Sequence, residues 1–258
     1  MDMQTRVDRD HVEPKIHAFR SSRDPERGLF NGLLSSLTAK DRARLLAGSE
    51  RVSLNAGATI IRPEMPPRFV YFIERGLVCE VAVGSQGCQL GVRSIGREGL
   101  AGWTAILGES DCPQRTQCVT EVTAVKVRSD VLAQAMDESC ALRARMLAYV
   151  QKAITEISDA AVATGRLKLE QRLARWLHAS FQRLGESDLP LTHEHLATML
   201  GVRRAGVTTA LHVLEGERAI KAWRGCIRLL DRTRLADLAE PKVFRPSITG
   251  AVGVAISA

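Results

Sequence analysis

The spacing of apolar residues along the chain changes character twice. Leucines recur at helical spacing between residues 29 and 46, which indicates two short helices. Between residues 51 and 127, short runs rich in β-branched residues alternate with glycines about every ten residues. From residue 129 onwards the spacing is helical again. Many short strands with frequent turn signals predict a β-sandwich or barrel, so the chain is expected to be an α+β protein.

A long helix is expected after the β-region. From residue 146 to 164, apolar and small residues alternate spacings of four and three, as in a coiled-coil seam. The seam consists of Met146, Val150, Ala153, Ile157, Ala160 and Thr164, of which the first five are the expected interface residues. It predicts a dimer interface between two copies of the chain. The alternative is a helix that packs on its own domain.

The most informative stretch runs from residue 191 to 231. Thr192 is a good N-cap, because its side-chain oxygen can accept a hydrogen bond from a free amide at a helix start. Gly201 ends this helix, since glycine readily adopts the left-handed conformation of a sharp helix exit. A second amphipathic run begins near Arg203. Two short helices joined by a tight glycine turn predict a helix-turn-helix, whose second helix enters the DNA major groove.

Two short apolar runs follow at 219–223 and 226–230, and the Arg224-Gly225 dipeptide between them can turn a hairpin. A helix-turn-helix followed by a hairpin is a winged helix. Basic residues outnumber acids here, as expected of a surface that meets phosphates. The residues expected to contact DNA are Arg203, Arg204, Thr208, Thr209, His212 and Arg224. Arg204 is the candidate for a direct guanine contact. The alternative is a helical hairpin in which glycine only ends a helix.

Composition narrows the class of protein. With 258 residues the chain can form one large domain or two ordinary ones, and a net charge of +7 favours polyanionic partners. The sequence contains no apolar run of the roughly 20 residues that span a bilayer, and its charged N-terminus does not resemble a signal peptide. We therefore expect a cytoplasmic protein without membrane contact.

Metal and cofactor sites find little support in the sequence. The six cysteines are scattered and include no C-x-x-C pair, so neither a zinc site nor a disulfide framework is expected. Cys112, in a polar loop, is expected to be the most exposed thiol. His193 and His195 diverge on a helix, so they are expected at the surface rather than on a metal. Nucleophile-elbow, zincin, P-loop and dinucleotide-binding motifs are all lacking, which disfavours an enzyme.

The order of these segments resembles the Crp/Fnr family of bacterial transcription regulators. The resemblance covers about residues 29 to 240 and is most specific in LTHEHLATMLGVRRAGVTTALHVLEGERAI, FVYFIERGLVCEV and IGREGLAG. It implies a β-roll sensor domain, jelly-roll-like, followed by a dimerisation helix and a C-terminal winged helix-turn-helix. It further implies a homodimer that binds an inverted repeat in double-stranded promoter DNA and acts on RNA polymerase.

On this basis we divide the chain into five segments. They are a mobile arm (1–28), the β-roll sensor domain (29–138), the dimerisation helix and hinge (139–168), the winged helix-turn-helix (169–240) and a C-terminal tail (241–258).

The sensor region departs from the cyclic-AMP-binding members. Those members hold the phosphate with a Gly-Glu turn and an Arg-Ser pair. Here Arg115-Thr116 matches the pair, but residues 99–108 contain no acid. The adenine-contacting Thr-Ser pair appears as Ile157-Ser158. By resemblance, Arg115, Thr116 and Ser158 are the candidate ligand-binding residues, and cyclic AMP is expected to bind weakly or not at all.

The cofactors of other members are not expected either. The N-terminal cysteines of iron–sulfur members are missing, and no histidine occurs between His17 and His178 to hold haem. The same gap removes the metal site of cupin-like enzymes, which leaves that alternative weak. A second alternative is a ligand-binding module that acts on a partner protein.

The DNA-reading helix also departs from the best-known members, which carry Arg-Glu at its start and an Arg four residues after the Glu. Arg204-Ala205 and Thr209 fill these places here, so the target site is expected to differ.

Overall fold

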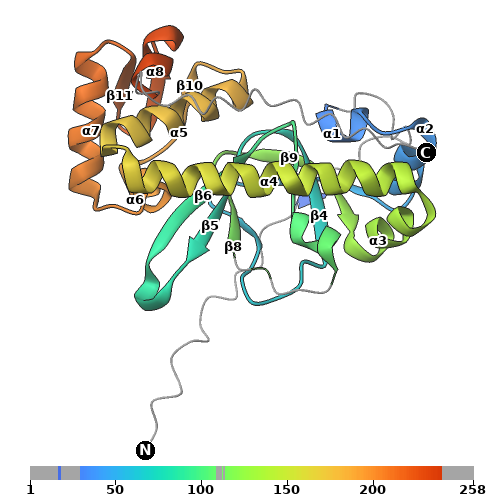
Figure 1. Ribbon diagram of the computed structural model, residues 1–258. Helices are drawn as coiled ribbons and strands as arrows, with labels where there is room; N and C mark the ends of the chain where they lie inside the picture. Colours follow the sequence, from blue (N-terminus) through green and yellow to red (C-terminus); the bar gives the residue numbers. More distant parts are fainter. Residues whose placement is uncertain (1–16, 19–29, 109–111, 113, 240–258) are drawn as a thin grey trace, which may run out of the picture.

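The computed structural model of the protein describes residues 17–18, 30–108, 112 and 114–239 (Figure 1). The predicted C-terminal tail lies outside these residues. So does the predicted N-terminal arm, except for the two-residue strand β1 (His17–Ala18), which pairs with Val52 and Ser53. No helix within the described ranges is long and apolar enough to cross a membrane.

The β-region forms two antiparallel sheets, as the short alternating runs predict. The first has the strand order β1, β2 (Glu50–Leu54), β9 (Val122–Arg128), β4 (Phe69–Arg75), β7 (Leu100–Ala101). The second has the order β3 (Thr59–Ile61), β8 (Gln114–Cys118), β5 (Val78–Val83), β6 (Gln89–Ile95). Short 3-10 turns, η1 (Ser85–Gly87) and η2 (Trp103–Leu107), connect strands. Apolar side chains from both sheets, such as Ile73, Val78 and Ile95, form a buried core between them.

The turn between β4 and β5 depends on Gly76. Its φ of +89° lies in a region that side chains other than glycine's rarely adopt. A Cβ at this position would lie 2.1 Å from the carbonyl oxygen of Glu121. Only glycine therefore allows β4 and β5 to turn against the loop that precedes β9.

Helices flank the β-region, and the longest of them packs against β6 of the second sheet. The described helices here are α1 (Gly32–Ser35), α2 (Ala39–Leu46), α3 (Ser129–Glu138) and the 27-residue α4 (Cys140–Arg166). Thr38 caps α2 and Ser139 caps α4, each by accepting a hydrogen bond from a backbone amide. In Figure 1, α4 extends along the sheets from the α3 end to the helix-turn-helix end.

The structure contradicts the assignment of Met146, Val150 and Ala153, in the apolar seam of α4, to a subunit interface, whereas Ile157 and Ala160 keep part of their surface exposed. Met146, Val150 and Ala153 are buried in the core that this chain's own β-domain forms with α2 and α3, and Ile157 packs against that core. Ala160 lines a cavity within the chain. The heptad spacing reports one apolar face of the helix, and the domain's own sheet covers that face. Leu147 and Ile154 are exposed on a stripe roughly 80–100° around the helix from this seam, and Val162 is exposed nearer the C-terminal end of α4.

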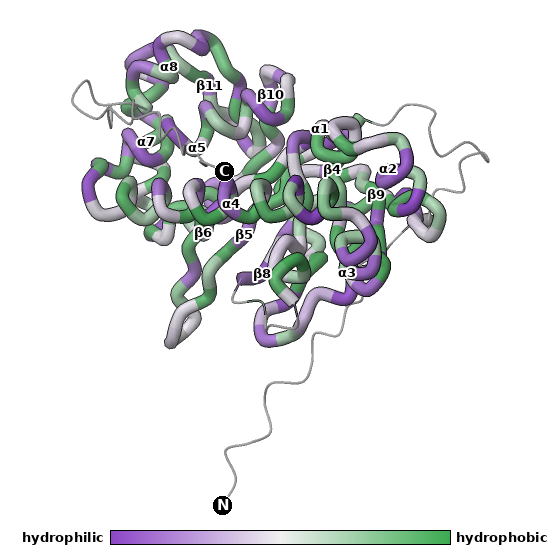
Figure 2. Tube along the Cα trace, turned by 45° about the vertical axis from the view of Figure 1, so that its right-hand side comes forward, coloured by the Kyte–Doolittle hydropathy of each residue, from purple (hydrophilic) through white to green (hydrophobic). Residues whose placement is uncertain are grey.

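The C-terminal segment folds as the predicted winged helix. Its elements are α5 (Leu169–Leu184), β10 (Asp188–Leu189), α6 (His193–Leu200), α7 (Arg204–Gly216), β11 (Ile220–Trp223), β12 (Cys226–Leu229) and α8 (Arg232–Ala239). Its core includes the fully buried Phe181, Val207 and Ile227. Apolar and polar residues alternate along α4 and α7, as expected of helices with one buried face (Figure 2).

Candidate nucleic-acid interface

The helix-turn-helix is built from local signals in the sequence. The Thr192 hydroxyl accepts a hydrogen bond from the His195 amide at 3.3 Å, which starts α6. Gly201 ends α6 with φ +64°, in the left-handed region, and its amide donates back to Thr198. Arg203 then stands at the N-cap of α7 without a capping side-chain bond. The amides of the first turn of α7 therefore lack a side-chain acceptor at the end that enters a groove in this class of motif.

One face of α7 is buried and the other is free. Its buried residues are Val207, Ala210, Leu211 and Leu214. Arg203, Arg204, Thr209 and His212 are exposed, whereas Thr208 is half-buried. The amphipathic spacing thus places the predicted DNA-contacting residues on the solvent side of α7.

The polar side chains predicted to contact DNA already interact within the domain to different extents. The Thr208 hydroxyl lies 3.1 Å from His193 Nδ1 and donates to the Arg204 carbonyl, so it is partly engaged inside the motif. Thr209 donates to the Ala205 carbonyl at 3.3 Å. His212 Nδ1 lies 3.4 Å from Glu215, an interaction that is ionic only when the imidazole is protonated.

Some basic side chains of the DNA-binding domain form ion pairs with carboxylates, and others do not. Lys221 pairs with Glu215, and Arg228 pairs with Asp188 at 2.6 Å, so these two wing cations are neutralised within the domain. No carboxylate among the described residues forms an ion pair with Arg203, Arg204 or Arg224. Arg224 stands at the tip of the wing beside Gly225, whose φ is +75°. Uncompensated positive charge therefore lies at the start of α7 and at the wing, among other places, and phosphates would approach there.

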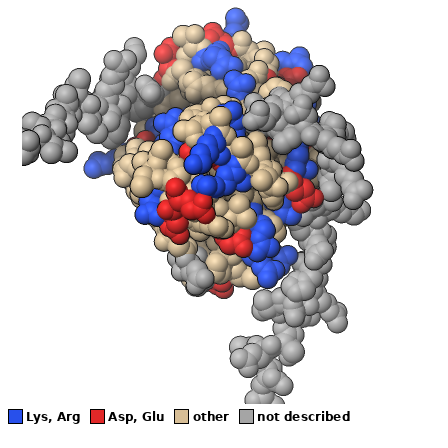
Figure 3. Space-filling view, turned by 90° about the vertical axis from the view of Figure 1, so that its right-hand side faces the viewer, with Lys and Arg blue, Asp and Glu red and all other residues tan. Residues whose placement is uncertain are grey.

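The charge pattern at the other end of the molecule is different. The face at the right-hand side of Figure 1, which carries α2 and α3, has basic and acidic side chains side by side (Figure 3). Part of this mixture is a set of local ion pairs, such as Arg44 with Glu138 and Arg143 with Asp137.

The candidate ligand-binding residues of the sensor domain are not brought together by the described contacts. The Arg115 guanidinium donates to Gln89 at 2.8 Å, and Thr116 is buried on β8. Ser158 is exposed on α4 and donates to the Ile154 carbonyl of its own helix.

A buried ionic cluster, which the sequence did not predict, lies beside this site. Arg93 donates to Glu156 at 2.6 Å and to the Tyr149 hydroxyl at 2.7 Å, and its Nη1 lies 3.6 Å from Glu80. Glu80 pairs in register with Thr116 on one side and with Arg93 on the other. A carboxylate therefore lies next to the place where a bound phosphate is expected. The sequence indicates this cluster only through single charged residues within apolar strands, such as the glutamate in VCEVAV.

Burial governs the charges of this cluster. It raises the pKa of Glu80, and the nearby Arg93 cation opposes that rise. Burial alone would lower the pKa of Arg93, but Tyr149 and Glu80 outweigh it and raise the pKa. The guanidinium thus stays charged and joins the second sheet to α4.

The cysteines are placed differently from the prediction. Cys112 is buried and its thiol donates to the Gln114 carbonyl, so the expectation of an exposed thiol is wrong. The prediction rested on the polar residues next to Cys112 in the sequence, and these do not reveal that β8 and the core cover the thiol. Among the cysteines, Cys88 and Cys140 are exposed.

A winged helix with free arginines on its second helix, joined to a β-roll, defines a DNA-binding transcription regulator. Comparison with known proteins supports this class. Residues 171–238 match the model of the Crp-like helix-turn-helix domain, and residues 51–139 match the cyclic nucleotide-binding domain. The chain belongs to the Crp/Fnr family of transcription regulators.

Individual relatives agree with this assignment. The transcriptional regulator SdrP of Thermus thermophilus is 28% identical over 201 residues, which span 75% of this chain and 96% of SdrP. A CRP/FNR-family transcriptional regulator from the same organism has a similar structure, with 25% identity, a TM-score of 0.60, and coverage of 74% of this chain and 99% of that one. FixK2 of Bradyrhizobium japonicum shares the fold at 18% identity and a TM-score of 0.64, over 75% and 98% of the two chains.

Proposed function

We propose that this regulator binds an inverted repeat in promoter DNA as a homodimer, in the cytoplasm, and recruits or obstructs RNA polymerase. The observation that supports this most directly is the set of unpaired arginines at the start of α7 and on the wing. Arg204 reads a guanine, while Arg203 and Arg224 contact phosphates. Thr208, Thr209 and His212 supply further contacts from the same side of α7. The activity is that of a binding protein rather than an enzyme.

Two arginine variants test this assignment of roles. Arg204→Ala is expected to cost about 1–3 kcal/mol on the specific site and to relax preference at one base position. Arg224→Ala is expected to weaken binding to all sequences alike and to lower the salt slope by about one. Selection on randomised DNA, followed by titrations at several salt concentrations, measures both. A wild type without preference for any inverted repeat would refute the promoter-binding proposal, and unchanged base preference in Arg204→Ala would remove that residue from the reading set.

The dimer is formed through the exposed face of α4 rather than its buried seam. Leu147 and Ile154 lie one heptad apart on this face, and both side chains are 46% exposed. Val162, 45% exposed, extends the apolar surface towards the hinge. Two copies of α4 that pack along this face would place two winged helices on opposite sides of a two-fold axis, as an inverted repeat requires.

The sensor domain does not use cyclic AMP. The chain lacks the ribose-binding glutamate of the cyclic-AMP-binding members, and the turn there carries the buried Trp103. The buried carboxylate of Glu80 lies beside Thr116, where it would repel a phosphate if ionised. Arg115, Thr116 and Ser158 remain candidate contacts for a different ligand. Titration calorimetry is expected to show no micromolar binding of cyclic AMP, and micromolar or tighter binding would contradict this.

A further inference from the structure

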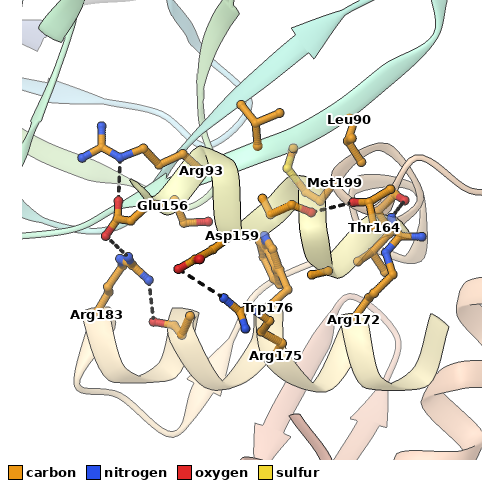
Figure 4. A pocket seen from close by; sticks show the side chains of 17 residues that line it. Leu90, Arg93, Glu156, Asp159, Thr164, Arg172, Arg175, Trp176, Arg183 and Met199 are labelled. Carbon is orange, nitrogen blue, oxygen red and sulfur yellow. Dashed lines mark hydrogen bonds and ion pairs between the residues drawn. The ribbon is translucent and has the colours of Figure 1, made fainter. Parts of the chain in front are cut away.

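A cavity of about 170 Å³ lies between the two domains (Figure 4), and its lining includes no described residue of α7 or the wing. Residues of β6, α4, α5 and α6 line it. The sensor domain contributes Leu90 and Val92, and the DNA-binding domain contributes Trp176 and Met199. Its walls therefore belong to both domains.

Most charges around the cavity are already paired. Arg93 and Arg183 share Glu156, and Arg183 also donates to Glu98 at 2.8 Å. Arg175 lies 3.9 Å from Asp159. These pairs close one end of the cavity, as the dashed contacts in Figure 4 show.

Within the ranges that the structure describes, two polar groups that line the cavity lack such partners: the Arg172 guanidinium has no carboxylate partner, and the Trp176 indole N–H has no acceptor. They lie one helical turn apart on α5, so both side chains lie on the same face of that helix and line the cavity. Arg172 donates to the Leu200 carbonyl, but no carboxylate among the described residues pairs with it. Burial lowers the pKa of its guanidinium, as expected of a cation without a nearby anion. The indole Nε1 of Trp176 is buried and has no acceptor within the described part of the chain.

We propose that this cavity binds a small organic acid. Its carboxylate accepts hydrogen bonds from the Arg172 guanidinium and the Trp176 indole N–H. Its short apolar body lies against Leu90, Ala160 and Met199. The cavity is smaller than the about 300–1,000 Å³ of a drug-sized pocket, so the ligand is smaller than a nucleotide.

The bound acid would act on the arrangement of the two domains. Because both domains line the cavity, the ligand binds only while they are packed as they are here, and it stabilises that packing. The contacts of the acid are separate from α7 and the wing. The proposal therefore does not depend on which DNA site the protein reads.

The test uses the full-length protein with ¹⁵N-labelled tryptophan. The chain has three tryptophans, so the spectrum has three indole N–H signals, and Trp176→Phe identifies the relevant one. Benzoate and hexanoate are the probes, benzamide is the neutral analogue, and sulfate tests for simple anion binding. We expect benzoate or hexanoate to shift the Trp176 signal saturably, with no comparable shift from benzamide or sulfate.

Two variants assign the effect to the cavity. Ala160→Leu fills it and is expected to abolish the shift, whereas Ala141→Leu, at an exposed position of the same helix, is expected to leave it intact. Arg172→Gln removes the cation and is expected to weaken binding at least about tenfold. If Ala160→Leu fails to fold, as thermal unfolding would reveal, Arg172→Gln decides alone. The proposal is overturned if neither acid shifts the signal, if sulfate or benzamide shifts it equally, or if folded Ala160→Leu or Arg172→Gln binds like the wild type.

Discussion

Replacing Ile154 with Asp is expected to convert the protein from a dimer to a monomer. Leu147, Ile154 and Val162 each keep nearly half of their surface exposed in the single chain. Burying an apolar side chain completely contributes about 1.5–3 kcal/mol, so burying the remaining half contributes about 0.7–1.4 kcal/mol. Three such side chains from each of two subunits together contribute about 4–8 kcal/mol.

The substitution acts twice, because each subunit carries it. Two isoleucines represent about 1.4–2.8 kcal/mol of this contribution, and two unpaired carboxylates in an apolar interface cost several kcal/mol more. A loss of about 4 kcal/mol weakens dimerisation by about three orders of magnitude.

Sedimentation velocity at micromolar concentration measures the change. The matched control is Val213→Asp, which places the same charge at a similarly exposed position on α7 and is expected to leave the dimer unchanged. A wild type that sediments as a monomer, or an Ile154→Asp protein that stays dimeric, would show that this face of α4 is not the interface.

The remaining predictions concern stability and pH. Gly76→Ala places a side chain at a positive φ, with its Cβ 2.1 Å from a carbonyl oxygen. It is expected to lower the free energy of unfolding, measured with urea, by about 2–5 kcal/mol. Gly57→Ala has a similar φ but open space around its Cβ, so it is expected to cost only about 1–2 kcal/mol; equal losses would refute the steric argument. Burial raises the pKa of the Cys79 and Cys118 thiols from 9.0 to about 12. The pKa values of these thiols are higher in the folded state than in the unfolded state. Their contribution to the free energy of unfolding is therefore complete below about pH 9 and is lost as the pH rises toward about 12. A free energy of unfolding that stays flat across this range, or iodoacetamide labelling of Cys79 as fast as that of the exposed Cys88, would contradict this.

The sequence by itself determined the local architecture of the protein. Thr192 and Gly201 specify the ends of α6 because capping and a left-handed helix exit depend on the residue and its immediate neighbours. The Arg224-Gly225 turn and the two runs around it likewise specify the wing. Alternating apolar residues and regularly spaced glycines specify the strands of the β-roll. Each of these signals acts within one element or one turn, so it can be recognised without knowledge of the fold.

Only the tertiary structure decided what each surface faces. The seam through Met146 and Ala153 shows that α4 has an apolar face, but spacing does not say whether the chain's own sheet or a second subunit covers it. Arg228 is a basic residue like Arg204, yet Asp188, forty residues away in sequence, neutralises it. The cluster around Arg93 joins residues from two strands and a helix. Ion pairs and burial are set by distances across the fold, and such distances arise only when the elements pack together.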